Sequence, residues 1–173
     1  MSQATPADPT PATPTSPATA PGTPPAVRSV TWDGAAPVII DQRLLPGEVR
    51  HWRLDTVAQV IEAIQTLAVR GAPAIGVTGA YGMVVGLDEG GAADMDAEAV
   101  RTLVAELAVS IGEARPTAVN LSAAVRRVVA ATAGAADGPA AREAALRNAI
   151  EQHEQDLAAC EAMGRHGRVA LAG

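Results

Sequence analysis

The sequence has 173 residues, of which 48% are hydrophobic and 18% are charged, and its formal net charge is −6. These values are typical of a soluble globular domain, and the acidic balance argues against a nucleic-acid partner, which would require a basic face. All 13 basic residues are arginine, which excludes a Schiff-base lysine or a P-loop lysine. The single cysteine, Cys160, excludes an internal disulfide and a multi-cysteine zinc site, and it favours a reducing, cytoplasmic location.

The first 25 residues hold eight of the 13 prolines and a single charged residue. They have neither the basic start and apolar segment of a signal peptide nor the character of a transit peptide. We therefore expect residues 1–26 to form a disordered tail rich in Pro, Thr and Ala. A plain linker is favoured over a Pro-rich ligand for a partner domain.

Three short β-branched or aromatic runs follow the tail, at residues 28–34, 36–47 and 48–55. Asp-Gly and Pro-Gly turn signals separate them, which predicts a three-stranded antiparallel sheet. From Thr56 onward the apolar residues recur with a helical period, and Thr56 lies near the N-cap. The apolar positions of this first helix are Val57, Val60, Ile61, Ile64 and Leu67.

Residues 73–87 (PAIGVTGAYGMVVGL) carry no charge and contain four glycines three or four positions apart, namely Gly76, Gly79, Gly82 and Gly86. This stretch of about 15 residues is shorter than the roughly 20 that are needed to span a bilayer. It predicts a helix that is buried on all sides in the middle of a bundle, where glycines permit close packing.

Three more helices are predicted, at residues 96–113, at 118–133 and from Pro139 to Gly164. Asp94 or Asp96 caps the first of them. The last helix places one side-chain stripe on a common face: Leu146, Ile150, His153, Leu157 and Cys160. The predicted fold class is therefore α+β, a small three-stranded antiparallel sheet followed by a helical bundle.

Residues 168–173 (RVALAG) have the composition of a buried strand, but no parallel sheet precedes them that such a strand could join. We therefore interpret the chain as a fragment. Its folded domain occupies residues 27–167, and residues 168–173 begin a second, α/β domain.

The sequence Arg70-Gly71-Ala72-Pro73 places an arginine directly ahead of a helix whose first residue is predicted to be Pro73. The unbonded N–H groups of the first helical turn suit a phosphate or a carboxylate. Gly71 permits a positive φ or a close approach of the backbone to a ligand. This turn is the first element of a predicted anion pocket.

Arg115-Pro116-Thr117 repeats the arrangement, with Thr117 able to cap the helix that follows. Two arginines at helix N-termini can both grip a phosphate in bidentate fashion, which indicates a pocket formed by Arg70 and Arg115 together. For either arginine alone, a solvated or carbonyl-capping side chain is an equal alternative.

Other polar residues give weaker signals. His153 and Cys160 share a helical face about 10 Å apart, too far for a thiolate–imidazole pair, so core packing is favoured for both. His51 lies in a predicted strand and His166 in a Gly-flanked loop, so no metal site is expected.

Acidic residues such as Asp88 and Glu89 fall mostly at helix ends or on polar faces, where solvation accounts for them. Asn120 can hold either a backbone group or a ligand, and the sequence leaves both options open.

Four stretches occur in a fixed order: SVTWDG (29–34), LLPGEV (44–49), VRGAPAIG (69–76) and RPTAVNL (115–121). Together they resemble the N-terminal part of the methylthioribose-1-phosphate isomerase family. That family is related to ribose-1,5-bisphosphate isomerase and to the α, β and δ subunits of translation initiation factor 2B. The resemblance extends from about Arg28 to the end of the chain and leaves the Pro-rich tail without a counterpart.

The resemblance implies a homodimeric aldose-ketose isomerase of methionine salvage that uses no metal or organic cofactor. Its substrate would be 5-methylthioribose 1-phosphate and its product 5-methylthioribulose 1-phosphate. In the family, the Arg-Gly-Ala turn and the arginine of RPTAVNL contact the substrate, so the resemblance assigns substrate binding to Arg70, Gly71, Ala72 and Arg115. The family's catalytic cysteine and aspartate lie in a Rossmann-like C-terminal domain and have no equivalents here, Cys160 included.

On this interpretation the chain recognises the phosphate and is inactive alone. The missing Rossmann-like domain would carry out ring opening and the transfer of hydrogen between C1 and C2, by a proton relay or a hydride shift. Two alternatives remain open. The chain could be a non-catalytic regulatory or assembly module like the initiation factor subunits, or part of a ribose-1,5-bisphosphate isomerase.

Overall fold

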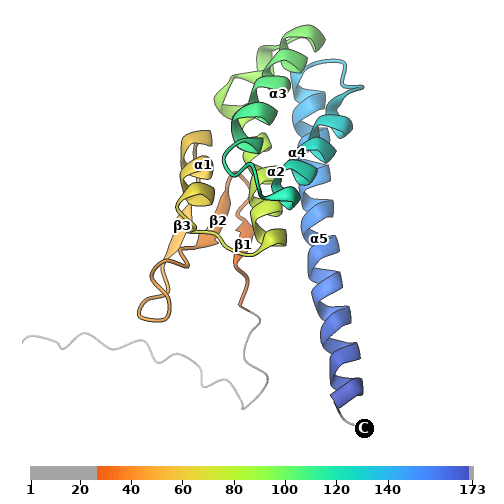
Figure 1. The fold of residues 1–173 in the computed structure, drawn as a ribbon. Helices are drawn as coiled ribbons and strands as arrows, with labels where there is room; N and C mark the ends of the chain where they lie inside the picture. Colours follow the sequence, from red (N-terminus) through yellow and green to blue (C-terminus); the bar gives the residue numbers. More distant parts are fainter. Residues whose placement is uncertain (1–26, 172–173) are drawn as a thin grey trace, which may run out of the picture.

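The structure, a computed structural model, describes residues 27–171, so the predicted tail at 1–26 and residues 172–173 lie outside it. In chain order its elements are β1 (Val30–Trp32), β2 (Pro37–Ile40), β3 (His51–Arg53), α1 (Val57–Gln65), α2 (Ala72–Glu89), a short 3-10 helix η1 (Ala92–Asp94), α3 (Ala97–Gly112), α4 (Val119–Thr132) and α5 (Gly138–Leu171). Figure 1 shows the sheet beside α1 and α2, with α3, α4 and α5 completing the bundle. The predicted α+β class is confirmed.

The three strands form one antiparallel sheet in the order β1-β2-β3, as the turn signals predicted. Val30 pairs with Ile39, and Ile39 pairs with Trp52. Val30, Ile39 and Leu54 are buried, so one face of the sheet joins the core that it shares with the helices.

Helix α1 begins after Thr56, whose hydroxyl accepts a hydrogen bond of 3.2 Å from the backbone N–H of Gln59. The helix ends at Gln65, so the prediction that Leu67 is part of it is wrong. Leu67 has φ 61°, a left-handed conformation that cannot continue a right-handed helix.

Helix α2 is the centre of the bundle, and every residue from Ile75 to Leu87 is buried, as predicted. Its glycines stand where neighbouring side chains approach most closely. A Cβ atom on Gly79 would overlap the Leu121 side chain, and one on Gly86 would overlap Leu107. Glycine at these positions therefore lets α3 and α4 pack directly against the α2 backbone.

Asp96, not Asp94, caps α3, because its carboxylate accepts hydrogen bonds from the N–H groups of Glu98 at 3.0 Å and Ala99 at 2.9 Å. Asp88 and Glu89 are also structural residues, so the interpretation that solvation accounts for them is wrong. Asp88 pairs with Arg142 of α5, and the carboxylate of Glu89 accepts a hydrogen bond of 2.8 Å from the N–H of Val57.

The buried face of α5 differs from the predicted stripe. Its buried side chains are mainly small: Ala141, Ala145, Ala149 and Gln152. Ile150 is 37% exposed and Cys160 is exposed, so the predicted core position of Cys160 is wrong. Alanines allow α5 to approach α2 and α4 closely, which large side chains on the same face would prevent.

Helix α5 also continues past its predicted end at Gly164. Residues 168–171 are helical, so the predicted strand is wrong there, and His166 lies in the helix rather than in a loop. A glycine inside a helix costs about 1 kcal/mol, which is less than the hydrogen bonds that α5 would lose if it ended at Gly164. The helix therefore continues through this glycine. In the described part of the chain the only sheet is formed by β1, β2 and β3, and residues 168–171 do not join it.

The last turns of α5 extend beyond the other helices (Figure 1). Within residues 27–171, no helix has both the length and the apolar character required to cross a membrane.

Candidate functional site

The N-terminus of α2 forms one side of the site. Gly71 is the N-cap with φ 93°, and its carbonyl accepts a hydrogen bond of 3.0 Å from the N–H of Ile75. The helix begins at Ala72, one residue before the predicted start at Pro73. The N–H groups of Ala72 and Ala74 belong to the first turn, which has no intrahelical acceptors, so they carry the positive end of the helix dipole.

The N-terminus of α4 forms the other side. A tight turn leads into it, in which Ala118 donates a hydrogen bond of 2.9 Å to the carbonyl of Arg115. The N-cap is Ala118 and makes no side-chain cap, so the prediction that Thr117 caps this helix is wrong. In the first turn of α4 the N–H groups of Val119 and Leu121 donate to the carbonyls of Thr117 and Ala118, so among residues 118–122 the N–H of Asn120 is the one left for a ligand.

The two N-termini meet at a cleft of about 430 Å³. Its lining residues are Gly71, Ala72, Ile75, Arg115, Thr117, Ala118, Val119 and Asn120. The helices come together here because α2 has a glycine opposite α4: a Cβ on Gly76 would lie 3.0 Å from the carbonyl oxygen of Asn120. Three of the four predicted site residues, Gly71, Ala72 and Arg115, thus line one cleft.

Arg70 is the predicted site residue that does not line this cleft. Its side chain is exposed, and its Nε donates a hydrogen bond of 3.0 Å to the carbonyl of Leu67. One side of the guanidinium thus caps a carbonyl, as the structural alternative predicted. Arg70 directly precedes Gly71, which lines the cleft.

Arg115 is half-buried, and within residues 27–171 no carboxylate lies within 4.0 Å of it. An arginine without an acidic neighbour, placed beside two helix N-termini, produces a region of positive potential in the cleft. Guanidinium and backbone N–H groups are the donors that bind phosphate oxygens in proteins. The arrangement is therefore chemically suited to an anion.

Asn120, for which the sequence allows either a backbone or a ligand contact, lines the cleft and a second hollow between α2, α4 and α5. Ile75 and Val119 also line the cleft. Nothing in the sequence indicates this except that each lies close to one of the two arginine-containing turns. No group of three His, Cys, Asp or Glu side chains within the described residues is placed to hold a metal ion.

An aromatic cluster joins β1, α2 and α5 away from the residues that line the cleft. The Trp32 ring stacks on Tyr81 at 4.9 Å between centroids, and the Tyr81 hydroxyl lies 3.0 Å from Nδ1 of His153. Burial raises the pKa of Tyr81 to about 12, so the phenol stays protonated near neutral pH and shares a hydrogen bond with the imidazole of His153. The pair fastens α5 to α2.

The Tyr81–His153 contact predicts a pH-dependent stability. Burial, followed by the positive charge of Arg28, lowers the pKa of His153 below its usual value, although Asp156 and Glu154 oppose the shift. Below the unfolded-state pKa of about 6.5, the unfolded chain binds this proton more readily than the folded one. The free energy of unfolding should thus fall as the pH drops through this region.

Chemical denaturation at several pH values measures this effect. His153→Gln keeps a hydrogen-bonding partner for Tyr81 but does not titrate. The free energy of unfolding of this variant should therefore fall less than that of the wild type as the pH drops. His166→Gln, at an exposed position on α5, should keep the wild-type profile. A His153→Gln variant with an unchanged pH profile would contradict the prediction.

Comparison with known proteins agrees with this fold. The sequence matches the initiation factor 2 subunit family over residues 68–172. Methylthioribose-1-phosphate isomerase of Gemmatimonas aurantiaca is 45% identical over 152 residues, which are 85% of this chain and 42% of that protein. 5-Deoxyribose 1-phosphate isomerase of Moorella thermoacetica is 39% identical over 151 residues, 84% of this chain and 42% of that protein.

Two solved structures share the architecture. The δ subunit of translation initiation factor eIF-2B from A. fulgidus superimposes with a TM-score of 0.71 at 32% identity, over 76% of this chain and 38% of that one. 5-Methylthioribose 1-phosphate isomerase from Pyrococcus horikoshii OT3 superimposes with a TM-score of 0.67 at 26% identity, over 74% and 36%.

The fold is thus an α+β domain in which a small sheet precedes a helical bundle. The chain belongs to the initiation factor 2 subunit family, and the resemblance seen in the sequence is confirmed. It spans about two fifths of the length of the curated relatives that it matches.

Proposed function

We propose that this chain is the phosphate-binding part of an aldose-ketose isomerase that converts 5-methylthioribose 1-phosphate to 5-methylthioribulose 1-phosphate in methionine salvage. The observation that carries the proposal is the cleft in which the N-termini of α2 and α4 meet beside Arg115. A dianionic phosphate fits these donors. The 45% identity to an isomerase of this name supports the choice of substrate.

In the proposal, Arg115 and the amides of Gly71 and Ala72 hold the phosphate, and Arg70 approaches it from beside the cleft. The side chains that line the cleft contain no group that exchanges protons near neutral pH. They can orient the sugar but cannot move a proton between C1 and C2. The acid–base groups then come from outside residues 27–171, as in a protein with a further Rossmann-like domain.

Three parts of the proposal concern the whole protein. We propose that it is a homodimer and that it acts in the cytoplasm without a metal or organic cofactor. Light scattering of the purified protein measures the first, and activity after dialysis against a chelator tests the absence of a metal requirement.

Isothermal titration of the 173-residue chain tests the phosphate site. Ribose 1-phosphate should bind, inorganic phosphate should compete with it, and ribose should not bind. The chain alone should show no isomerase turnover, because its cleft lacks proton-transfer groups. Turnover by the purified chain would overturn this division of roles, and equal binding of ribose and ribose 1-phosphate would overturn the phosphate site.

A non-catalytic regulatory or assembly module is the second candidate, since the structural match to the initiation factor δ subunit has the higher TM-score of the two. Such a module has no need of a sugar phosphate, so the same titration separates the two functions. Competition among 5-methylthioribose 1-phosphate, 5-deoxyribose 1-phosphate and ribose 1,5-bisphosphate then identifies the substrate.

A further inference from the structure

The turn between α1 and α2 contains a residue in an unfavourable conformation. Leu67 has φ 61°, and a left-handed conformation is unfavourable for a residue other than glycine. Such a conformation persists only where surrounding contacts fix it. The turn leads within a few residues to Arg70 and Gly71, so whatever fixes Leu67 also affects the proposed phosphate site.

The contacts that fix the turn come from the residues after β2. The backbone N–H of Gln42 donates to the carbonyl of Ala68 at 2.9 Å, and its side-chain amide donates to the carbonyl of Arg70 at 3.4 Å. Nη1 of Arg43 donates to the hydroxyl of Thr66 at 3.0 Å. The turn is therefore held on both sides of Leu67 from a distant part of the chain.

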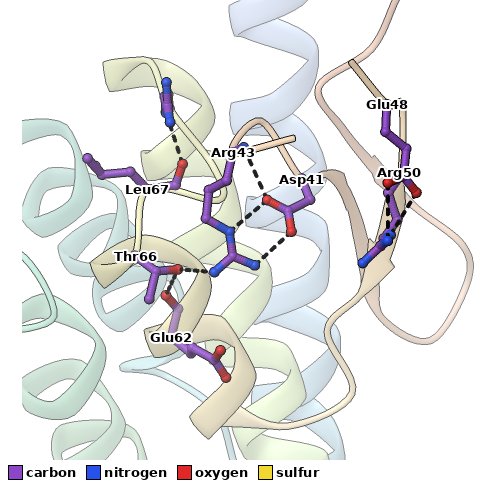
Figure 2. A network of polar contacts seen from close by, with 8 residues as sticks. Asp41, Arg43, Glu48, Arg50, Glu62, Thr66 and Leu67 are labelled. Carbon is purple, nitrogen blue, oxygen red and sulfur yellow. Dashed lines mark hydrogen bonds and ion pairs between the residues drawn. The ribbon is translucent and has the colours of Figure 1, made fainter. Parts of the chain in front are cut away.

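Figure 2 shows that Arg43 is itself bonded to Asp41 as well as to Thr66. Its Nε and Nη2 donate to the two carboxylate oxygens of Asp41 at 2.8 and 2.7 Å, and its guanidinium lies 5.5 Å from the centre of the Trp52 ring. Asp41 is only 5% exposed. A planar guanidinium can make all of these contacts at once, whereas a lysine ammonium cannot.

The Thr66 hydroxyl links Arg43 to the end of α1. It accepts from Arg43 and donates to the carbonyl of Glu62 at 2.7 Å, which fixes the last turn of α1 directly before Leu67. The carbonyl of Leu67 in turn accepts from Nε of Arg70 at 3.0 Å. The orientation of the Arg70 side chain thus depends on the left-handed residue that Arg43 helps to hold.

We infer that Arg43 is a positioning residue that acts through Thr66 and Leu67 to set the place of the Arg70 side chain beside the phosphate cleft. This inference rests on the proposed function, since it assumes that Arg70 meets a phosphate there. Arg43 does not line the cleft and has no contact with the ligand in this role.

A double-mutant cycle on the 173-residue chain tests the inference, with the dissociation constant for ribose 1-phosphate as the readout and the melting temperature recorded beside it. Arg43→Ala should weaken binding about fivefold, within the range of effects that act through neighbouring residues. In an Arg70→Ala background the same change should have less than a twofold effect, because the residue through which it acts is gone.

Two further variants refine the test. Thr66→Val removes the contact to Arg43 but keeps the Arg43–Asp41 pair, so this variant should weaken binding and can be measured even if Arg43→Ala fails to fold. Thr66→Ser keeps the hydroxyl and should retain wild-type affinity. The control is Arg50→Ala, which removes a neighbouring arginine that pairs with exposed Glu48 at 3.0 Å (Figure 2). Its affinity should equal that of the wild type.

The outcomes separate the two ideas. Wild-type affinity in both Arg43→Ala and Thr66→Val, or an equal loss with and without Arg70, would overturn the positioning role while the phosphate site stands. Failure of the wild-type chain to bind ribose 1-phosphate would overturn the proposed function and the positioning role together.

Discussion

Arg115→Ala is expected to weaken the binding of ribose 1-phosphate by the 173-residue chain about tenfold to a hundredfold. A hydrogen bond to a charged group contributes about 1.5–3 kcal/mol, and each 1.4 kcal/mol is a factor of ten in affinity. Arg115 should reach this range because it is half-buried in the cleft between two helix N-termini. Arg70→Ala should have a smaller effect, about tenfold, since Arg70 is exposed and already donates to Leu67.

Titration calorimetry at constant ionic strength measures both variants. The control is Arg147→Ala on α5, which removes the same charge from an exposed pair with Glu143. Because exposed pairs of this kind contribute only about 0.3–0.5 kcal/mol, this variant should bind like the wild type. Arg115→Ala with the affinity of the control would return Arg115 to the role of a surface residue. Raising the salt concentration should weaken wild-type binding through screening.

The fold could be predicted from the sequence wherever local signals determine it. The Asp-Gly turn, the Thr56 cap and the unbroken apolar stretch of α2 each depend on neighbours within a few residues. The cleft was predicted in part for the same reason, because Gly71 and Arg115 each precede a helix. That the two N-termini meet depends on the contact between Gly76 and Asn120, which tertiary packing alone creates.

The errors also have a physical cause. The predicted stripe of Leu146, Ile150 and Leu157 consists of large apolar side chains, whereas α5 packs against α2 and α4 mainly through alanines. The contact of Arg43 with Thr66 joins residues 23 positions apart. No helical or strand period relates such residues, so no sequence pattern indicates that they meet.

The close packing of α5 leads to the second large expected effect, at its first residue. Gly138→Ala should lower the free energy of unfolding by about 3 kcal/mol, the upper end of the usual cost of overpacking. A Cβ on Gly138 would overlap the backbone carbonyl of Ala92. Backbone cannot rotate away as a side chain can, so either η1 or α5 must shift.

Neither element is free to do so. Ala92 is 1% exposed, its carbonyl accepts from the N–H of Met95 at 3.1 Å, and the Met95 carbonyl accepts from the N–H of Gly138 at 2.9 Å. Moving α5 away would break the second of these bonds and open the alanine face of the helix. Urea denaturation should therefore show a lower midpoint for Gly138→Ala. Gly164→Ala, with nothing within 4 Å of the added Cβ, should lose no stability, since alanine favours a helix by about 1 kcal/mol over glycine. Equal midpoints for the two variants would mean that η1 yields at little cost, and the packing of α5 would then depend on its alanines rather than on its first residue.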